Sequence, residues 1–207
     1  MTDAKAIPKV FGLGLSKTGT KTLGTCLEHL GYDHFSWNEP FAERVLRGDV
    51  DEALRVARQH DSFEDLPWPA VFEALDANFP DAKFVLTERA DPERWYQSLL
   101  RHAEYKGITE VRERFYGHAL PHGRRDRMID VYMSHNERVR RHFADRPGKL
   151  LVLCWEKDPG WEPLCDFLGH AVPARDIPHR NKRRRLKTST LLRRIGYTAK
   201  GVLHRLT

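Results

Sequence analysis

Residues 10–22 read Val-Phe-Gly-Leu-Gly-Leu-Ser-Lys-Thr-Gly-Thr-Lys-Thr. The apolar beginning predicts a short buried strand that runs to about Leu15, and a helix is expected from about Gly19 to Leu30. The turn between them combines glycines, hydroxyls and two lysines. Such a turn offers backbone N–H groups, the positive end of a helix dipole and cationic side chains, which together bind anions. The alternative is a tight turn whose Gly and Thr residues only cap the helix.

The alternation of strand and helix continues along the chain. Further strands are expected at about 32–37, 61–65, 83–87 and 150–153. Helices are expected at about 39–47, 50–59, 126–144 and 161–168, with two more after Pro69 and after Asp91. Residues 105–125 hold three glycines, a proline and many charges, which predicts a mobile connection. This pattern predicts an α/β fold with a central parallel sheet of about five strands flanked by helices, whose ligands bind at the carboxyl ends of the strands.

Length and composition narrow the class of protein. The 207 residues suit one domain with or without a tail. No stretch approaches the roughly 20 apolar residues of a membrane-spanning helix, and the N-terminus has no apolar segment of the kind that directs secretion. The three cysteines are too few and too scattered for a disulfide framework or a zinc site, so a cytoplasmic location is expected.

Charge is distributed unevenly along the chain. Residues 177–207 contain ten Lys and Arg and no Asp or Glu, whereas the rest of the chain holds 25 basic and 29 acidic residues. The basic segment also carries an amphipathic pattern, which favours either contact with an anionic membrane surface or a solvated tail. Aromatic residues are not interleaved with the basic ones and no nucleic-acid-reading motif is present, so we expect no nucleic-acid partner.

The turn after the first strand departs from two common nucleotide-binding patterns. Gly14 and Gly19 have the spacing of G-x-x-x-x-G-K-[ST], but Thr20 follows Gly19 and Lys21 comes one position late. Acidic residues follow two of the apolar strands, but they come one or two positions later than the acidic residue that holds magnesium in such enzymes. The dinucleotide fingerprint lacks its third glycine. A magnesium-dependent nucleotide kinase or ATPase with a variant loop therefore stays an alternative.

Four blocks together resemble the sulfotransferases that use 3′-phosphoadenosine-5′-phosphosulfate (PAPS). Residues 16–20, Ser-Lys-Thr-Gly-Thr, resemble the [PS]-K-[ST]-G-T loop of that family, in which the lysine precedes the glycine. Residues 89–98 resemble its R-[DN]-P element, whose Arg and Ser hold the 3′-phosphate. Residues 135–169 resemble its last strand and the helix that ends in Phe-Leu-Gly, and residues 178–181 resemble the motif that follows. The similarity spans about residues 8–181.

One departure from the family pattern concerns the Arg of the second block. Ala90 separates Arg89 from Asp91, whereas the family has Arg directly before Asp-Pro. The spacing from the proline to Ser98 is kept, so the resemblance assigns Ser98 to the 3′-phosphate. Arg89 takes the same role if the turn absorbs the extra residue, and Arg94 is the alternative.

The resemblance implies a P-loop-like three-layer fold and the transfer of a sulfuryl group from PAPS to an acceptor hydroxyl or amine by in-line displacement. It implies that Lys17 stabilises the charge that grows on the bridging oxygen, so that no metal is required. The residues that would bind the co-substrate are Ser16, Thr18, Gly19, Thr20, Lys21, Thr22, Arg89 and Ser98.

The resemblance also implies a catalytic base after the third strand. Glu64-Asp65-Leu66-Pro67 stands at the matching place, with Asp65 as the first candidate and Glu64 as the second. The alternative for Asp65 is a helix cap or a local ion pair. Trp68 is a candidate for contact with the acceptor, and residues 105–125 are a candidate lid over it.

The predicted domain organisation is a sulfotransferase-like domain at residues 1–181 and a basic tail at residues 182–207. The tail is expected to close over the 3′-phosphate of the nucleotide or to contact an anionic membrane at the inner surface, or to remain solvated. A non-catalytic module that binds anions or membranes through the loop and tail is the third functional alternative. The predicted partners are the nucleotide and an acceptor that the sequence does not identify.

Overall fold

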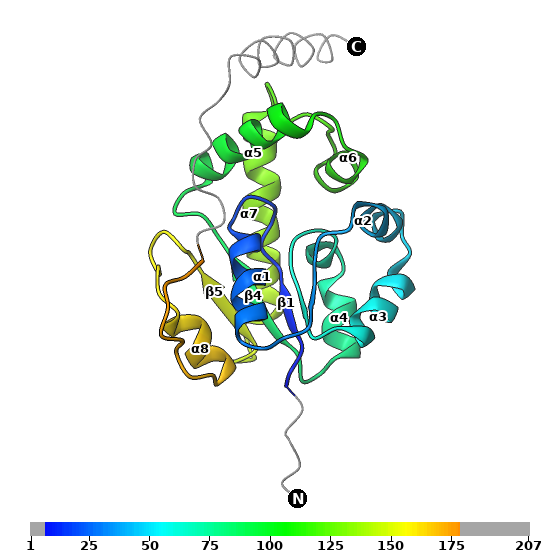
Figure 1. The fold of residues 1–207 in the computed structure, drawn as a ribbon. Helices are drawn as coiled ribbons and strands as arrows, with labels where there is room; N and C mark the ends of the chain where they lie inside the picture. The colour runs from blue at the N-terminus through cyan, green and yellow to red at the C-terminus, as the bar shows by residue number, and fades with distance from the viewer. Residues whose placement is uncertain (1–6, 179–207) are drawn as a thin grey trace, which may run out of the picture.

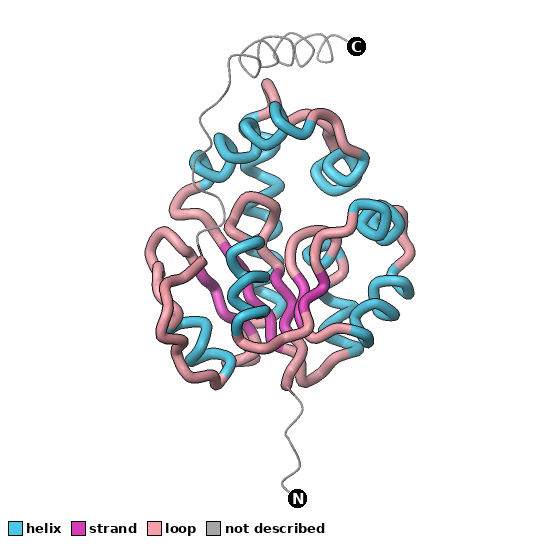
Figure 2. Tube along the Cα trace, viewed as in Figure 1, coloured by secondary structure: helices cyan, strands magenta, loops and turns pink. Residues whose placement is uncertain are grey.

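The computed structural model describes residues 7–178 and contains five strands in one parallel sheet, ordered β2-β3-β1-β4-β5. The strands are β1 (Val10–Gly12), β2 (His34–Phe35), β3 (Ser62–Phe63), β4 (Lys83–Thr87) and β5 (Leu150–Leu153). Figure 2 shows the strands side by side with helices around them. The predicted α/β fold is confirmed. The predictions for the basic tail lie outside the described residues.

Eight α-helices and one 3₁₀ helix occur within residues 7–178. The α-helices are α1 (Thr20–His29), α2 (Glu39–Leu46), α3 (Val50–Gln59), α4 (Phe72–Asn78), α5 (Pro92–Lys106), α6 (Glu110–Tyr116), α7 (Arg125–His142) and α8 (Glu162–Leu168), and the 3₁₀ helix is η1 (Trp68–Ala70). No helix among the described residues is both long and apolar enough to cross a membrane.

The sheet is covered on both faces because successive strand residues point to opposite sides. On one face, Val10 and Val85 pack with apolar residues of α1 and α8. On the other, Phe11 and Phe84 pack with apolar residues of α2, α3, α4 and α7. A third cluster joins α5, α6 and α7 beyond the carboxyl ends of the strands (Figure 1). This cluster places helices over the edge of the sheet at which ligands of such folds bind.

Two predictions about individual segments are wrong. Residues 105–125, predicted to be a mobile connection, contain α6, which is capped by the Thr109 hydroxyl and buries Tyr116. Trp68, predicted as a candidate acceptor contact, is 1% exposed and lies 4.4 Å from Phe63 between ring centroids. Its ring is part of the core beneath the sheet, because the chain turns inward at η1 instead of continuing along the surface.

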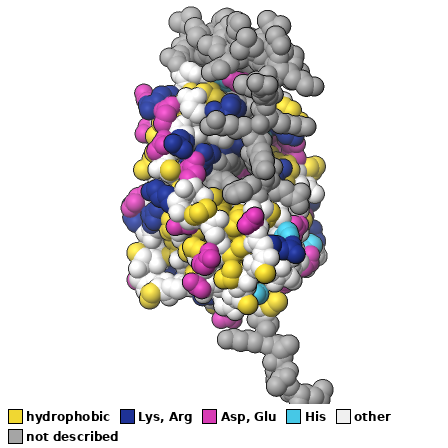
Figure 3. Space-filling model, turned by 60° about the vertical axis from the view of Figure 1, so that its left-hand side comes forward, with side chains coloured by type: hydrophobic (Ala, Val, Ile, Leu, Met, Phe, Trp, Pro, Cys, Tyr) yellow, Lys and Arg dark blue, Asp and Glu magenta, His cyan; other side chains and the backbone are white. Residues whose placement is uncertain are grey.

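Charged side chains on the surface of the domain are mostly interspersed. Figure 3 shows basic and acidic side chains next to one another on the side that carries α8, with apolar side chains gathered below them. Exposed pairs such as Arg47 with Glu110 and Arg138 with Glu73 repeat this arrangement elsewhere. The described domain therefore lacks the single-sign charge of residues 177–207.

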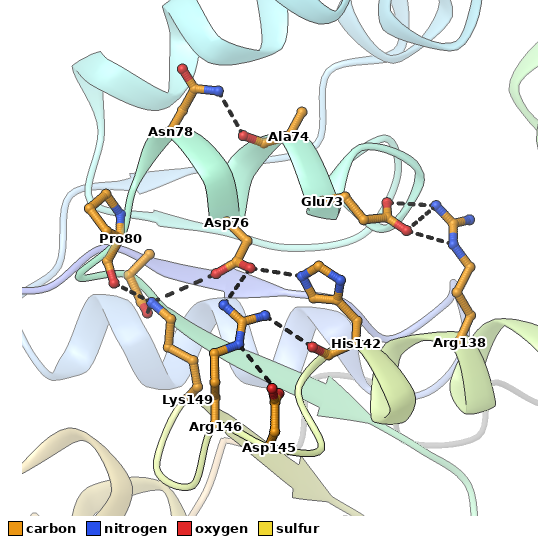
Figure 4. Close-up of polar contacts among 11 residues, drawn as sticks. Glu73, Ala74, Asp76, Asn78, Pro80, Arg138, His142, Asp145, Arg146 and Lys149 are labelled. Atoms are coloured by element: carbon orange, nitrogen blue, oxygen red, sulfur yellow. Dashed lines mark hydrogen bonds and ion pairs between the residues drawn. The ribbon is translucent and has the colours of Figure 1, made fainter.

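A buried carboxylate ties α4 to the end of α7 and to the start of β5 (Figure 4). Asp76 is 8% exposed and lies 2.7 Å from His142 Nε2, 2.7 Å from Arg146 Nη1 and 3.9 Å from Lys149 Nζ. Burial acts to raise the pKa of Asp76, but the hydrogen bonds from His142 and Arg146 outweigh it and hold that pKa below its ordinary value. This cluster lies at the amino ends of the strands, away from the anion loop.

We predict that Asp76→Asn lowers the free energy of unfolding by about 1–3 kcal/mol at pH 7, because it removes the charge from a buried and hydrogen-bonded group. Since the pKa of Asp76 is depressed in the folded state, its contribution is present above pH 3.8 and is lost as the pH falls through the folded pKa. Urea denaturation at pH 7 and pH 3 measures both effects. Glu73→Gln, which breaks the more exposed pair with Arg138, is the matched control; an equal loss there would contradict the assignment.

Candidate functional site

The loop between β1 and α1 is a sharp turn at the carboxyl edge of the sheet. Lys17 and Gly19 have left-handed φ values of 80° and 97°, and Gly19 is the N-cap of α1. The first turn of a helix leaves backbone N–H groups without intrahelical partners. The N–H groups of Thr20 and Lys21 therefore stand at the positive end of the α1 dipole. The residues predicted to form the anion loop thus form a turn that leads directly into the N-terminus of α1.

The hydroxyls of the loop have two different environments. Thr18 is 1% exposed, and its Oγ1 donates to Leu15 O at 2.8 Å and lies 2.6 Å from Thr87 Oγ1. This hydroxyl holds the loop together from inside. Ser16 Oγ and Thr20 Oγ1 instead donate to a carboxylate that follows β3, the neighbour of β1 in the sheet.

That carboxylate belongs to Asp65, at the end of β3. Asp65 Oδ1 accepts hydrogen bonds from Ser16 Oγ at 2.5 Å and from Leu66 N at 2.9 Å, and Oδ2 accepts one from Thr20 Oγ1 at 3.2 Å. Burial lowers the pKa of Lys17, and the nearby charge of Asp65 partly offsets this effect. Two predicted catalytic residues, Lys17 and Asp65, are thus brought to the same loop.

Glu64, the second candidate base, faces in another direction. Its side chain is 4% exposed and lies beneath α1, where a Cβ on Gly24 would be 3.1 Å from Glu64 Cγ. Burial, reinforced by the charge of Asp65, raises the pKa of Glu64 to about 8. Its Oε2 has no hydrogen-bond partner among the described residues. Glu64 therefore holds a proton at neutral pH, within the protein interior.

Arg89 reaches the loop although Ala90 intervenes before the Asp-Pro pair. Its Nη1 donates to Lys17 O at 3.3 Å and its Nη2 lies 2.7 Å from Glu156 Oε1. Arg94, the alternative, lies 3.4 Å from the same Glu156 oxygen. Ser98 lies one turn further along α5.

The remaining predicted residues divide by exposure. Lys21 is exposed at the start of α1, whereas Thr22 is 9% exposed and points inward. The structure therefore brings together the loop, Asp65 and Arg89, while Thr22 and Glu64 lie behind them.

Several residues near the loop were not found from the sequence. Burial, together with the charge of Lys17, lowers the pKa of His102 to about 3. Burial raises the pKa of Tyr116, and the charge of Asp65 adds to the rise. Arg94, Ser98 and His102 are spaced four apart, which places them on one face of α5. That spacing is a signal in the sequence that could have placed His102 near the site. The sequence holds no such signal for Tyr116.

Trp155, on the turn after β5, packs against the loop at Gly19. A Cβ on Gly19 would lie 2.4 Å from Trp155 Cδ1. The indole Nε1 of Trp155 and the Nε of Arg89 are buried and have no hydrogen-bond partner among the described residues. Two unsatisfied donors, one after β4 and one after β5, thus lie close to the anion loop. Within residues 7–178 no group of three or more His, Cys, Asp or Glu residues is placed to hold a metal ion.

We predict that Glu64→Gln flattens the dependence of stability on pH. The pKa of Glu64 rises from 4.5 to about 8 on folding, so the folded state keeps a proton that the unfolded state loses. The contribution of Glu64 to the free energy of unfolding is then fully present below pH 4.5. It is lost as the pH rises through about 8, by up to about 1.4 kcal/mol per pH unit.

Urea denaturation of wild type and Glu64→Gln at pH 5 and pH 8 measures this slope. Gln does not ionise, so the difference between the two pH values should shrink in the variant. Glu137→Gln, an exposed change on α7, is the control and should keep the wild-type slope. An unchanged slope in Glu64→Gln would show that Glu64 is ionised in the folded protein at neutral pH.

The chain is similar to known proteins along most of its length. The family model described as "Sulfotransferase domain" matches residues 9–107 and 101–186. A curated protein called "Ava biosynthesis cluster protein M", from Aspergillus versicolor, is 26% identical over an alignment 220 positions long, which covers 83% of this chain and 80% of that protein. The predicted family is confirmed, in preference to a nucleotide kinase or a non-catalytic module. The chain belongs to the sulfotransferase-domain family and is a transferase.

Proposed function

We propose that this protein transfers the sulfuryl group of PAPS to an acceptor hydroxyl or amine by in-line displacement. The observation that carries the proposal is the junction of the two motifs, because Arg89 donates to the carbonyl of Lys17 and so joins the anion loop to the start of α5. A nucleotide with phosphates at both the 5′ and 3′ positions needs donors at both places.

The donors around the loop fit such a nucleotide. The N-terminal turn of α1, Lys17 and Lys21 offer donors for the 5′-phosphate. Arg89 Nε and Trp155 Nε1 are buried donors without partners among the described residues, and an unmade buried hydrogen bond is costly. The oxygens of a bound phosphate would accept hydrogen bonds from these two donors. We assign the 3′-phosphate to Arg89 with Ser98, on the α5 side of the site.

Lys17 supplies the main electrostatic contribution in this proposal. As the sulfuryl group departs, negative charge grows on the oxygen that joined it to the 5′-phosphate, and a fixed cation near that oxygen lowers the barrier. The left-handed backbone of Lys17 and its contacts with Arg89 hold the residue at the turn. Because the lysine is already in place, little reorganisation is needed during the transfer.

Asp65 is the proposed base. Its carboxylate is fixed by Ser16, Thr20 and the Leu66 amide, next to the loop. It accepts the proton that the acceptor loses as its oxygen or nitrogen attacks sulfur. Glu64 is protonated at neutral pH and is buried beneath α1, so we do not assign the base to it.

We predict that Lys17→Ala lowers kcat by about a hundredfold to a thousandfold and weakens nucleotide binding far less, since its main partner is the charge of the transition state. Release of 3′-phosphoadenosine-5′-phosphate with a panel of hydroxyl and amine acceptors gives kcat, and calorimetry gives affinity. Lys21→Ala is the comparison and should weaken binding more than it lowers turnover. Equal losses in kcat and affinity for Lys17→Ala would make Lys17 a binding residue only.

We predict that the wild-type protein binds 3′-phosphoadenosine-5′-phosphate more tightly than ATP, with or without magnesium. Ser98→Ala should weaken binding of 3′-phosphoadenosine-5′-phosphate by about 1–3 kcal/mol, the cost of losing a hydrogen bond to a charged group. It should leave adenosine 5′-phosphosulfate, which has no 3′-phosphate, nearly unaffected. Ser134→Ala, an exposed change on α7, is the control. Tighter binding of magnesium-ATP would overturn the proposed donor.

A further inference from the structure

The carboxylate of Glu156 is bound by the groups assigned above to the 3′-phosphate. Its Oε1 lies 2.7 Å from Arg89 Nη2 and 3.4 Å from Arg94 Nη1, and its Oε2 accepts a hydrogen bond from Ala90 N at 2.7 Å. Two guanidinium groups and a backbone N–H just before α5 therefore hold one anion. These contacts are the kind that proteins offer to a phosphate monoester.

Glu156 reaches this position from a short turn that follows β5. The turn is closed by hydrogen bonds from Lys157 N and Asp158 N to Cys154 O, both 2.8 Å long. β5 pairs with β4 as far as Leu153, so the turn can move without breaking a sheet contact. Trp155, which covers Gly19, stands on the same turn. One small segment thus covers the anion loop and fills the neighbouring anion site.

We propose that Glu156 is an internal competitor of the 3′-phosphate, occupying the site formed by Arg89, Arg94 and the Ala90 amide until a 3′-phosphorylated nucleotide displaces it. This inference rests on the proposed function. The carboxylate and the phosphate carry the same sign of charge and need the same donors, so they cannot share the site. The Glu156 side chain is 27% exposed, and it turns into solvent when it leaves.

The competition gives the 3′-phosphate a specific role. A phosphate carries more negative charge than a carboxylate and more acceptor oxygens, so it can take the arginines from Glu156. A nucleotide with only a 5′-phosphate has nothing to place there and leaves Glu156 on Arg89. Glu156 therefore lowers affinity for 3′-phosphorylated nucleotides selectively.

Calorimetry at about 0.15 M salt with 3′-phosphoadenosine-5′-phosphate and with adenosine 5′-phosphate tests the proposal on wild type, Glu156→Gln and Glu156→Ala. Both variants should bind the 3′-phosphorylated nucleotide about five- to thirtyfold more tightly than wild type, the range expected when a charge-assisted hydrogen bond no longer has to be broken. Binding of adenosine 5′-phosphate should change by less than about twofold. Glu88→Gln, a carboxylate that pairs with Arg140 instead, is the matched control and should leave both affinities unchanged.

Unchanged or weaker binding of 3′-phosphoadenosine-5′-phosphate by both Glu156 variants would overturn the inference, since Glu156 would then hold Arg89 in its binding position. That result leaves the proposed donor intact as long as wild type prefers the 3′-phosphorylated nucleotide. Wild type and both variants binding the two nucleotides equally would overturn the proposed function and the inference with it. Thermal unfolding of each variant checks that the exposed substitution leaves the fold intact.

Discussion

The close approach of Gly14 to the end of β4 is the constraint on which the anion loop depends. A Cβ on Gly14 would lie 1.9 Å from Thr87 Oγ1 and 2.6 Å from Thr18 Oγ1. Only a glycine lets the chain pass this point, after which Thr18 and Thr87 join their hydroxyls at 2.6 Å. The loop then turns back through Lys17 and Gly19, and α1 begins with its N–H groups at the sheet edge. A packing constraint thus produces the geometry that binds anions.

Helices beyond the sheet edge hold the outer side of the same loop. Trp95 of α5 donates to Ser16 O at 3.0 Å and stacks on Tyr132 of α7 with 4.5 Å between ring centroids. His135 of α7 lies 2.8 Å from Leu13 O through Nε2, and burial lowers its pKa to about 4, so its ring is neutral at physiological pH. Because these side chains fix the loop in advance, little conformational entropy is lost when an anion binds.

The sequence predicts the fold well because its signals are local. An apolar run followed by a Gly-rich turn indicates the strand, loop and helix at residues 10–30, and Asp91 with the proline after it indicates the start of α5. The errors come from segments whose structure depends on distant partners. α6 buries only Val111, Arg112 and Tyr116, too few positions to show a helical period, and the burial of Trp68 depends on aromatic residues from other elements. Trp155 and Glu156 meet the site only through the pairing of β5 with β4.

That pairing also explains why opposite charges meet at the carboxyl edge. Thr87 lies opposite Leu153 in the parallel register, so the chain segments leaving β4 and β5 bring Arg89 and Glu156 to the same place. Cations gathered for a polyanion repel one another when no anion is present. Asp65 beside Lys17 and Glu156 beside Arg89 reduce that repulsion. The same carboxylates oppose the ligand, and the charge balance that stabilises the protein also sets how strongly an incoming phosphate must compete.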